Sequence, residues 1–329
     1  MASPGSPFDE IVFETGLIRI AAFRCHPEDP SFHDTGPASN YCFVFPRTSV
    51  EIQHEHEPAF VANPNVVTFY NSGQRYQRNP ISPEGDCCDW FGIAPDLVRD
   101  VIAAVDARAG DRMEQPFGIS HGKADAPTYL FQRSLFTHVT TARRVDELFV
   151  EEAVITLLNQ VIGSIYPVRR PARPAAITPH HRAVIRHVET LLSKDLQKQA
   201  KLSGIAREVG SSPYHLCRLF RRVTGTTLQR YRLRLRLRAA LAEVLDSNRS
   251  LTDIALEFGF SSHSHFTQSF GREFGVTPSS LRPRACEQFS DSAESHVALV
   301  VREYAHEIPG QNLSHNNHPD CLYRMRSSA

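Results

Sequence analysis

The sequence predicts a two-domain protein, with a β-rich N-terminal domain flanked by helices and an all-α C-terminal domain that contains two similar helical units. Three observations lead to this fold class. Residues 8–95 alternate short apolar runs with turn-forming residues. A helical segment in the second half recurs 49 residues further along the chain. The chain of 329 residues is long enough for two domains, and its charge is divided unequally between them.

The formal net charge of zero conceals this division. Residues 1–166 contain 12 Lys and Arg against 22 Asp and Glu, whereas residues 180–285 contain 18 against 8. A basic module on an otherwise acidic chain is typical of a protein that binds a polyanion. The charge alone does not distinguish DNA from RNA or from an acidic lipid surface.

The N-terminal segment is expected to form strands at 16–23, 41–45 and 65–70. Each is a short apolar run bounded by Pro, Gly, Asn or Asp. Many short strands at this spacing predict a barrel or a sandwich.

From residue 95 the apolar spacing becomes helical, which predicts helices over 96–109, 126–144 and 145–166. The last helix is expected to bury one apolar face in the core or, as an alternative, in a dimer seam. The residues expected on this face are Leu148, Ala153, Leu157, Val161 and Ile165. No run of 18 apolar residues occurs, so no membrane span is expected.

A proline-rich segment separates the two halves. Residues 167–174 contain three prolines, which oppose a continuous helix and favour a linker. The sequence therefore predicts one domain over 1–166, a linker over 167–179 and a second domain over 180–285. The polar tail, 286–329, is expected to be largely mobile and has no functional interpretation.

The repeat in the basic region has the same plan in both copies, 202–212 and 251–261. An Ile-Ala pair lies on a short helix. A glycine, Gly210 or Gly259, follows at the helix end, where the left-handed backbone conformation favours a residue without a Cβ. A serine then caps a second helix: Ser212 in the first copy, and Ser261 or Ser262 in the second. A helix, a short glycine turn and another helix form a helix-turn-helix unit, whose second helix enters the major groove of DNA.

The segment 228–246 joins the two units. Five arginines alternate with leucines there, which favours a strand, but the alanine-rich continuation favours a helix. A helix is the interpretation consistent with its neighbours. At a rise of 1.5 Å, ~18 residues span about 27 Å, which suits two helices that bind successive major-groove segments about 34 Å apart. The residues expected to face the core are Tyr231, Leu235, Leu241 and Leu245.

These residues together resemble the AraC/XylS family of bacterial transcription regulators. The resemblance covers about 100 residues. It rests on Ile205-Ala206, Ser212-Pro213-Tyr214-His215-Leu216-Cys217-Arg218-Leu219-Phe220, Gly225, Ile254-Ala255, Gly259-Phe260-Ser261, Ser264-His265-Phe266 and Phe270-Gly271-Arg272-Glu273-Phe274-Gly275-Val276-Thr277-Pro278. It implies two similar subdomains joined by a long helix, with both recognition helices on one face of the DNA.

The resemblance implies DNA-binding residues at matching positions. Arg218 can pair with guanine and Gln268 with adenine. Arg222 and Arg272 are expected to bind phosphate, and Cys217 to contact a thymine methyl group or nothing. For His265 a structural role is as well supported as a base contact. The full set is Ser212, Tyr214, Cys217, Arg218, Arg221, Arg222, His263, Ser264, His265, Gln268 and Arg272, while Phe220, Phe260, Phe266, Phe270 and Phe274 are assigned to the core.

The N-terminal half resembles the sensor domains of some family members, which are often cupin-like barrels. This resemblance is weaker and rests on 60–71 and 88–91. It implies a cupin-like barrel with flanking helices, whose effector-binding residues and effector are unknown.

Two other classes of function compete with this interpretation. A cupin metalloenzyme fused to a DNA-binding domain is suggested by His54-Glu55-His56, since alternate residues of a strand face one way. The remaining cupin metal pattern is missing, so we expect no metal, no catalytic residues, no enzyme activity and no cofactor. A sequence-tolerant architectural DNA binder would not need an acidic domain of this size. Seven scattered cysteines indicate reduced thiols, with a metal or redox sensor at Cys87-Cys88 as the alternative.

The sequence therefore predicts an effector-responsive transcription regulator. Its expected partners are double-stranded promoter DNA, a small-molecule effector in the N-terminal domain and a second copy of the chain, with RNA polymerase as a further candidate. No signal pattern is found at the N-terminus, so a cytoplasmic location is expected.

Overall fold

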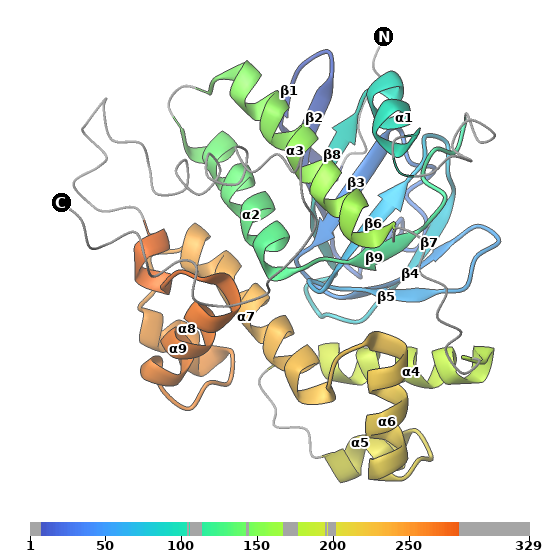
Figure 1. Cartoon of the computed structure of the whole chain (residues 1–329), viewed down its shortest axis with the longest axis vertical. Coiled ribbons are helices and arrows are strands. Elements are labelled where there is room, and N and C mark those ends of the chain that lie inside the picture. Colours follow the sequence, from blue (N-terminus) through green and yellow to red (C-terminus); the bar gives the residue numbers. More distant parts are fainter. Residues whose placement is uncertain are drawn as a thin grey trace.

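The N-terminal half has three layers: helices, a six-stranded sheet and a three-stranded sheet (Figure 1). The computed structural model describes residues 8–103, 105, 114–142, 145–166, 177–194, 196 and 202–282. The predictions for the tail 286–329 and for most of the linker, 167–176, lie outside these residues.

All strand pairs are antiparallel. In the six-stranded sheet the order is β1 (Asp9–Glu14), β2 (Ile18–Cys25), β8 (Asp86–Ile93), β3 (Tyr41–Pro46), β6 (Val66–Tyr70) and β9 (His121–Lys123). In the smaller sheet it is β5 (Phe60–Ala62), β4 (Val50–His54) and β7 (Tyr76–Pro80). The strands predicted at 16–23, 41–45 and 65–70 correspond to β2, β3 and β6. Pairing among the described residues gives two separate sheets, so the closed cupin-like barrel is not confirmed.

The large sheet is buried on both faces. Phe43 of β3 pairs with Phe69 of β6 and with Phe91 of β8, and these three rings face the helices. Their neighbours Cys42 and Trp90 point the opposite way, toward the smaller sheet. This explains why the central strands are almost continuously apolar.

Three helices are described in the rest of this half: α1 (Pro95–Ala103), which precedes β9, and α2 (Ala126–Thr141) and α3 (Glu147–Ile165), which follow it. Asp125 caps α2 by accepting a hydrogen bond from the amide of Thr128, and Asp146 caps α3 in the same way. The predictions for α2 and α3 are confirmed. The end predicted for the first helix, at residue 109, lies outside the described residues.

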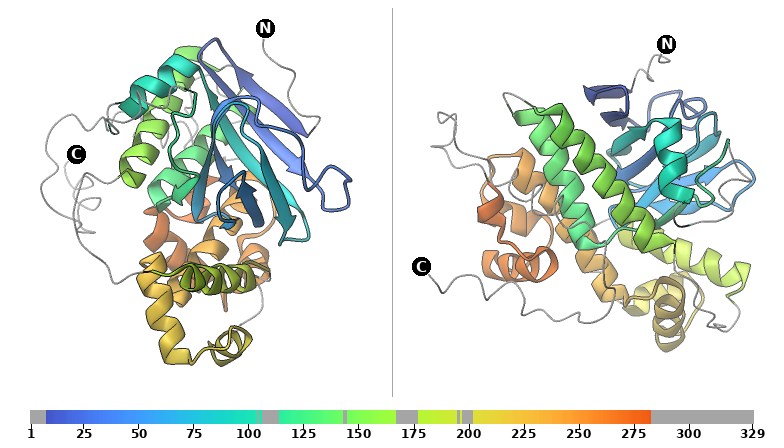
Figure 2. Two further views of the ribbon diagram at one scale, coloured as in Figure 1. Left: turned by 90° about the vertical axis from the view of Figure 1, so that its right-hand side faces the viewer. Right: turned by 45° about the horizontal axis from the view of Figure 1, so that its top comes forward.

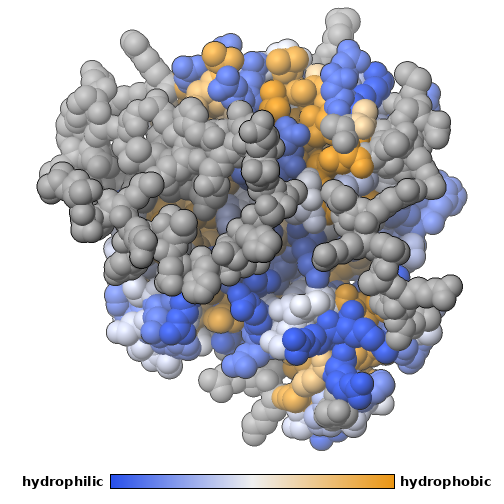
Figure 3. All heavy atoms as spheres, viewed as in Figure 1, coloured by the Kyte–Doolittle hydropathy of each residue, from blue (hydrophilic) through white to orange (hydrophobic). Residues whose placement is uncertain are grey.

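One predicted core residue of α3 is wrong. Leu148 is 65% exposed, because each helical residue turns the chain by about 100° and Leu148 lies almost opposite Val150. The buried face consists of Val150, Ala153, Val154, Leu157, Leu158, Val161 and Ile162. Among the described helices, α3 alone has the length and composition to cross a membrane. It packs against α2 and β9, as a core helix does. Apolar surface, orange in Figure 3, lies at the top of the view.

The C-terminal half is helical. It contains α4 (Pro179–Lys194), α5 (Leu202–Glu208), α6 (Pro213–Thr224), α7 (Leu228–Asp246), α8 (Leu251–Glu257), α9 (His263–Phe274) and a short 3₁₀ helix, η2 (Pro278–Leu281). The choice of helix over strand for 228–246 is confirmed, and the four residues predicted to face its core are buried.

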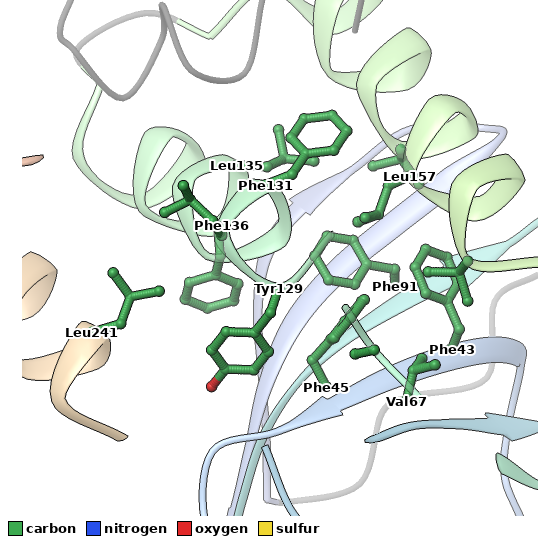
Figure 4. Packing of buried hydrophobic residues seen from close by; sticks show 14 of the residues in the cluster. Phe43, Phe45, Val67, Phe91, Tyr129, Phe131, Leu135, Phe136, Leu157 and Leu241 are labelled. Atoms are coloured by element: carbon green, nitrogen blue, oxygen red, sulfur yellow. The ribbon is translucent and has the colours of Figure 1, made fainter. Parts of the chain in front are cut away.

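Helix α7 contributes to two different hydrophobic cores. Tyr231 and Leu235 pack with α4, α5 and α6 around the first helix-turn-helix unit. Leu237 and Leu241, further along α7, belong to a core that contains both the second unit and the helices of the N-terminal half. Figure 4 shows Leu241 on the side of α2 that carries Phe136 and Tyr129. The second unit is therefore continuous with the N-terminal core, whereas the first has a core of its own. In the right-hand view of Figure 2, the second unit (orange) lies beside α2, and the first (yellow) lies at the other end of α7.

Buried polar contacts join α7 to the N-terminal half. Arg238 is fully buried and donates to the carbonyls of Pro64 and Ala124, at 2.6 and 2.9 Å. The hydroxyl of Tyr231 accepts a hydrogen bond from Nδ2 of Asn63 at 2.7 Å. The two halves are thus held in one arrangement by both apolar and polar contacts.

Candidate nucleic-acid interface

The first helix-turn-helix unit consists of α5 and α6. Gly210 adopts a φ of 62° in the turn between them, where a Cβ would be strained. Ser212 caps α6 by accepting a hydrogen bond from the amide of His215, and Pro213 occupies the first turn. Gly225, with a φ of 74°, ends α6 in the left-handed conformation.

The second unit, α8 and α9, repeats this construction. Gly259 has a φ of 72° in the turn, and Gly275 has a φ of 77° at the end of α9. Of the two serines left open by the sequence, Ser262 is the cap, since its hydroxyl accepts a hydrogen bond from the amide of His265. The left-handed conformations predicted for Gly210 and Gly259 are confirmed.

Helix α6 buries one face and exposes the other. Leu216, Leu219 and Phe220 lie in the core. Cys217, Arg218, Arg221 and Arg222 lie on the exposed side, while the side chain of Tyr214 lies outside the described part of the chain. Ser212 is exposed, but its hydroxyl is already bonded to the helix that it caps.

Helix α9 has the corresponding arrangement. Phe266, Phe270 and Phe274 are buried, at 0%, 0% and 4% exposure, as are Phe220 and Phe260, so the assignment of these rings to the core is confirmed. The other face is exposed and contains His263, Ser264, His265, Gln268 and Arg272.

The ring of His265 makes local contacts. Its Nδ1 lies 3.1 Å from Oγ of Ser261, and the ring packs edge-on against Phe260 with centroids 5.5 Å apart. These contacts hold the turn before α9 against its core. They favour the structural role over the base contact for this residue.

The arginines of α7 are divided between several contacts. Arg234 forms an ion pair with Glu273 of α9 at 2.9 Å. Arg236 donates to the carbonyls of Leu196 and Gly259, at 2.5 and 3.3 Å. Together with buried Arg238, these side chains position the helical units. Part of the basic charge seen in the sequence is therefore structural.

Two histidines, one on α6 and one beside it, were not among the predicted site residues. His215 is exposed and lines a surface hollow with Arg218, Arg221 and Arg222. His181 of α4 lies with its Nδ1 3.3 Å from an amino group of Arg222. The i, i+3, i+7 spacing of His215, Arg218 and Arg222 is the signal that would have identified His215.

The candidate metal motif does not form a shared strand face. His54 is the last residue of β4 and is buried, with its Nδ1 3.0 Å from the side-chain nitrogen of Gln74. Burial lowers the His54 pKa to about 4. His56 lies beyond the strand in a turn, with a φ of 66° and an exposed ring. In the described parts of the chain, no group of three or more His, Cys, Asp and Glu side chains could hold a metal ion.

The adjacent cysteines lie on opposite faces of β8. Cys87 is partly exposed and Cys88 is buried, and burial raises the pKa of both thiols. Neither thiol is thereby activated as a nucleophile.

Two helix-turn-helix units in tandem, each with a buried aromatic or aliphatic face and an exposed polar recognition face, define a DNA-binding protein of the helix-turn-helix class. A family profile described as "Helix-turn-helix domain" matches residues 205–284. Regulatory protein SoxS from Salmonella typhimurium is 33% identical over 104 residues, which cover 32% of this chain and 97% of that protein. The chain belongs to the AraC-type family of helix-turn-helix regulators.

Two other similarities cover larger shares of the chain. The HTH-type transcriptional regulator GlxA from Rhizobium meliloti is 38% identical over 145 residues, 44% of this chain. The match spans only 42% of GlxA. The structure of ToxT from Vibrio cholerae aligns with 80% of this chain and 96% of its own, at 11% identity and a TM-score of 0.35.

Proposed function

We propose that this protein is a sequence-specific transcription regulator that binds two successive major-groove segments of promoter DNA and responds to a small-molecule effector. One observation carries the proposal. Helices α6 and α9 each have a serine cap, a buried apolar face and an exposed polar face, and a single helix, α7, joins the two units. Such a pair of recognition helices suits two short boxes of sequence about one helical turn apart.

The base contacts are assigned by side-chain chemistry. Arg218 of α6 has the paired donors that match guanine, and Gln268 of α9 has the donor and acceptor that match adenine. Arg222 and Arg272 lie nearer the ends of their helices and are assigned to phosphate. Cys217 is a weak hydrogen-bond partner and is assigned to a thymine methyl group or to no contact.

The N-terminal half is proposed to be the sensor and dimerisation domain, 1–166, of cupin-like type, followed by the linker 167–179 and the DNA-binding domain 180–285. A cavity of about 220 Å³ between its two sheets supports an effector site there. A homodimer, contact with RNA polymerase and a cytoplasmic location complete the proposal. No catalytic activity, metal or cofactor is proposed.

The full-length protein should be incubated with a randomised DNA duplex library at fixed salt, and the retained duplexes sequenced. The expected result is a site with two short boxes about one helical turn apart. Arg218→Ala should relax the preference in one box and Gln268→Ala in the other, each by about 1–3 kcal/mol. Gln77→Ala, at an exposed position of β7, is the matched control and should change neither box.

The other outcomes would contradict the proposal. Retention that depends on the salt concentration but not on the DNA sequence would favour an architectural DNA binder. Failure to retain any duplex would reject DNA binding altogether.

A further inference from the structure

The cavity in the N-terminal half lies between the two sheets. It is lined by residues on one face of the large sheet, by the segment 35–40 and by Tyr76 of the smaller sheet. Its volume of about 220 Å³ is below the range of about 300–1,000 Å³ typical of sites for drug-sized ligands. It therefore suits a small molecule.

Aromatic rings form much of the lining: Phe23, Tyr70, Tyr76 and Trp90. Tyr70 and Tyr76 lie with centroids 4.8 Å apart and planes inclined at 60°. The faces of such rings are electron-rich and attract cations. The protein already uses this attraction here, because the guanidinium of Arg78 lies 4.5 Å from the centroid of Phe23.

The charges that line the cavity have one sign. Among the described residues of the lining, Asp9 and Asp86 are acidic and none is Lys, Arg or His. Asp9 accepts a hydrogen bond from Nε1 of Trp90 at 2.7 Å, which fixes a carboxylate beside the indole ring. Asp86 pairs with Arg78 through Oδ2 at 2.7 Å, and its side chain keeps 10% of its surface exposed. Arg78 balances the charge of Asp86, and its guanidinium also lies 5.5 Å from the centroid of Tyr76. The two carboxylates and this one cation leave an excess of negative charge, which together with the ring faces favours a cationic ligand over an anionic one.

We propose that this cavity binds a small organic cation, an amine or quaternary ammonium compound, whose charged group lies between the carboxylate of Asp9 and the rings of Trp90 and Tyr76. The inference rests on the proposed function, since it names the chemical class of the effector. Carboxylate and ring faces together recognise the positive charge, while the thiols of Cys42 and Cys88 provide apolar lining.

The protein contains a built-in reporter for this site. Trp90 is the only tryptophan of the chain, so a change in tryptophan emission on titration reports on the cavity itself. Full-length protein should be titrated with choline and with three probes that share a phenyl ring: phenethylamine, phenethyl alcohol and phenylacetate. The expected result is a saturable change with phenethylamine and choline, weaker binding of the alcohol and no binding of phenylacetate.

A matched pair of variants tests the role of the carboxylate. Asp9→Asn removes the charge but keeps an oxygen that can accept the Trp90 hydrogen bond. Glu10→Gln makes the same chemical change at the exposed neighbouring residue of β1. Asp9→Asn should weaken phenethylamine binding about tenfold or more, and Glu10→Gln should leave it within about twofold, as exposed charges contribute little.

Three results would overturn the inference. These are the absence of a saturable signal with both phenethylamine and choline, phenylacetate binding as tightly as phenethylamine, and equal affinities of Asp9→Asn and the wild type for phenethylamine. The readout does not require DNA. A protein that selects its DNA site but ignores amines would retain the proposed function and refute this inference. A protein that binds amines but selects no DNA site would support this inference and refute the proposed function.

Discussion

Arg133 of α2 and Asp246, the last residue of α7, form an ion pair across the boundary between the two halves of the chain. One amino group of Arg133 lies 2.8 Å from Oδ1 and 3.0 Å from Oδ2 of Asp246. The other donates to Asp89 of the large sheet at 2.5 Å. Burial would lower the pKa of Arg133, but the two carboxylates outweigh it and raise that pKa. The guanidinium therefore stays charged and ties three elements together.

The variant Asp246→Asn weakens the ion pairs of Asp246 with both Arg133 and Arg47. It should lower the free energy of unfolding by about 1.5–3 kcal/mol, the usual contribution of a hydrogen bond to a charged group. The pair is partly exposed at Asp246, but Arg133 is almost completely buried. Asp96→Asn is the control, because its ion pair with Arg99 is exposed and should contribute less than about 1 kcal/mol. Urea denaturation of both variants measures the difference, and equal losses would contradict a role for the buried pair.

Arg238→Met should destabilise the protein by about 2–4 kcal/mol, because it removes donors from two buried carbonyls, those of Pro64 and Ala124. Burial lowers the pKa of Arg238 to about 10, so the charge itself is not what stabilises the contact. Arg230→Met, at an exposed position of the same helix, should change stability by less than about 0.5 kcal/mol. Matching urea midpoints for the two variants would refute the prediction.

The pH dependence of stability should include a contribution from Glu189 of α4. Burial raises its pKa from 4.5 to about 7, against the hydrogen bond from Tyr231 and the charge of Lys123, which lower it. Because the folded-state pKa is the higher one, this contribution is fully present below pH 4.5 and is lost as the pH rises through 7.

Glu189→Gln should therefore become more stable relative to the wild type as the pH is raised from 5 to 8. Free energies of unfolding measured at pH 5, 6, 7 and 8 test this. The pKa values of His54 and His121, which burial lowers to about 4, give both proteins the same loss in acid, so this term cancels in the difference. A constant difference across the series would rule out the titration of Glu189.

Two glycines with the same backbone conformation should differ in their tolerance of alanine. Gly85 and Gly73 have φ values of 77° and 79°. A Cβ on Gly85 would lie 2.3 Å from the carbonyl oxygen of Cys25, whereas a Cβ on Gly73 would meet nothing within 4 Å. Gly73→Ala should cost about 1–2 kcal/mol for the left-handed backbone, and Gly85→Ala about 1–3 kcal/mol more for the clash. Thermal unfolding of the two variants separates backbone strain from crowding. Equal shifts in Tm would show that the structure around Gly85 moves to accommodate the Cβ without further cost.

The helix-turn-helix units could be predicted from the sequence because their signals are local. Gly210 and Ser212 lie within three residues of each other, and the apolar spacing of α6 and α9 is that of an ordinary amphipathic helix. The strands β2, β3 and β6 could also be predicted, because each is a short apolar run bounded by turn-forming residues. The choice between Ser261 and Ser262 required the structure, because both residues could cap α9 equally well.

What could not be predicted depends on distant contacts. Arg238 belongs to the same alternating run as exposed Arg230, yet its partners are main-chain carbonyls 114 and 174 residues away. Nothing in the side-chain pattern marks such acceptors. The sequence also indicated separate domains, whereas the second unit shares its hydrophobic core with α2 and α3. The sequence analysis assigned Tyr231, Leu235, Leu241 and Leu245 of α7 to one core, whereas Leu241 and Leu245 belong to a different core from the other two.

The shared core has a consequence for protein engineering. Chimeric regulators are commonly imagined as a sensor and a reader exchanged at the connecting segment. A cut within 167–179 would here divide a single hydrophobic core, leaving Leu237 and Leu241 exposed on one fragment and Phe136 on the other. A functional graft would have to replace the surfaces of α2 and α7 together, although more than 80 residues separate these two helices along the chain.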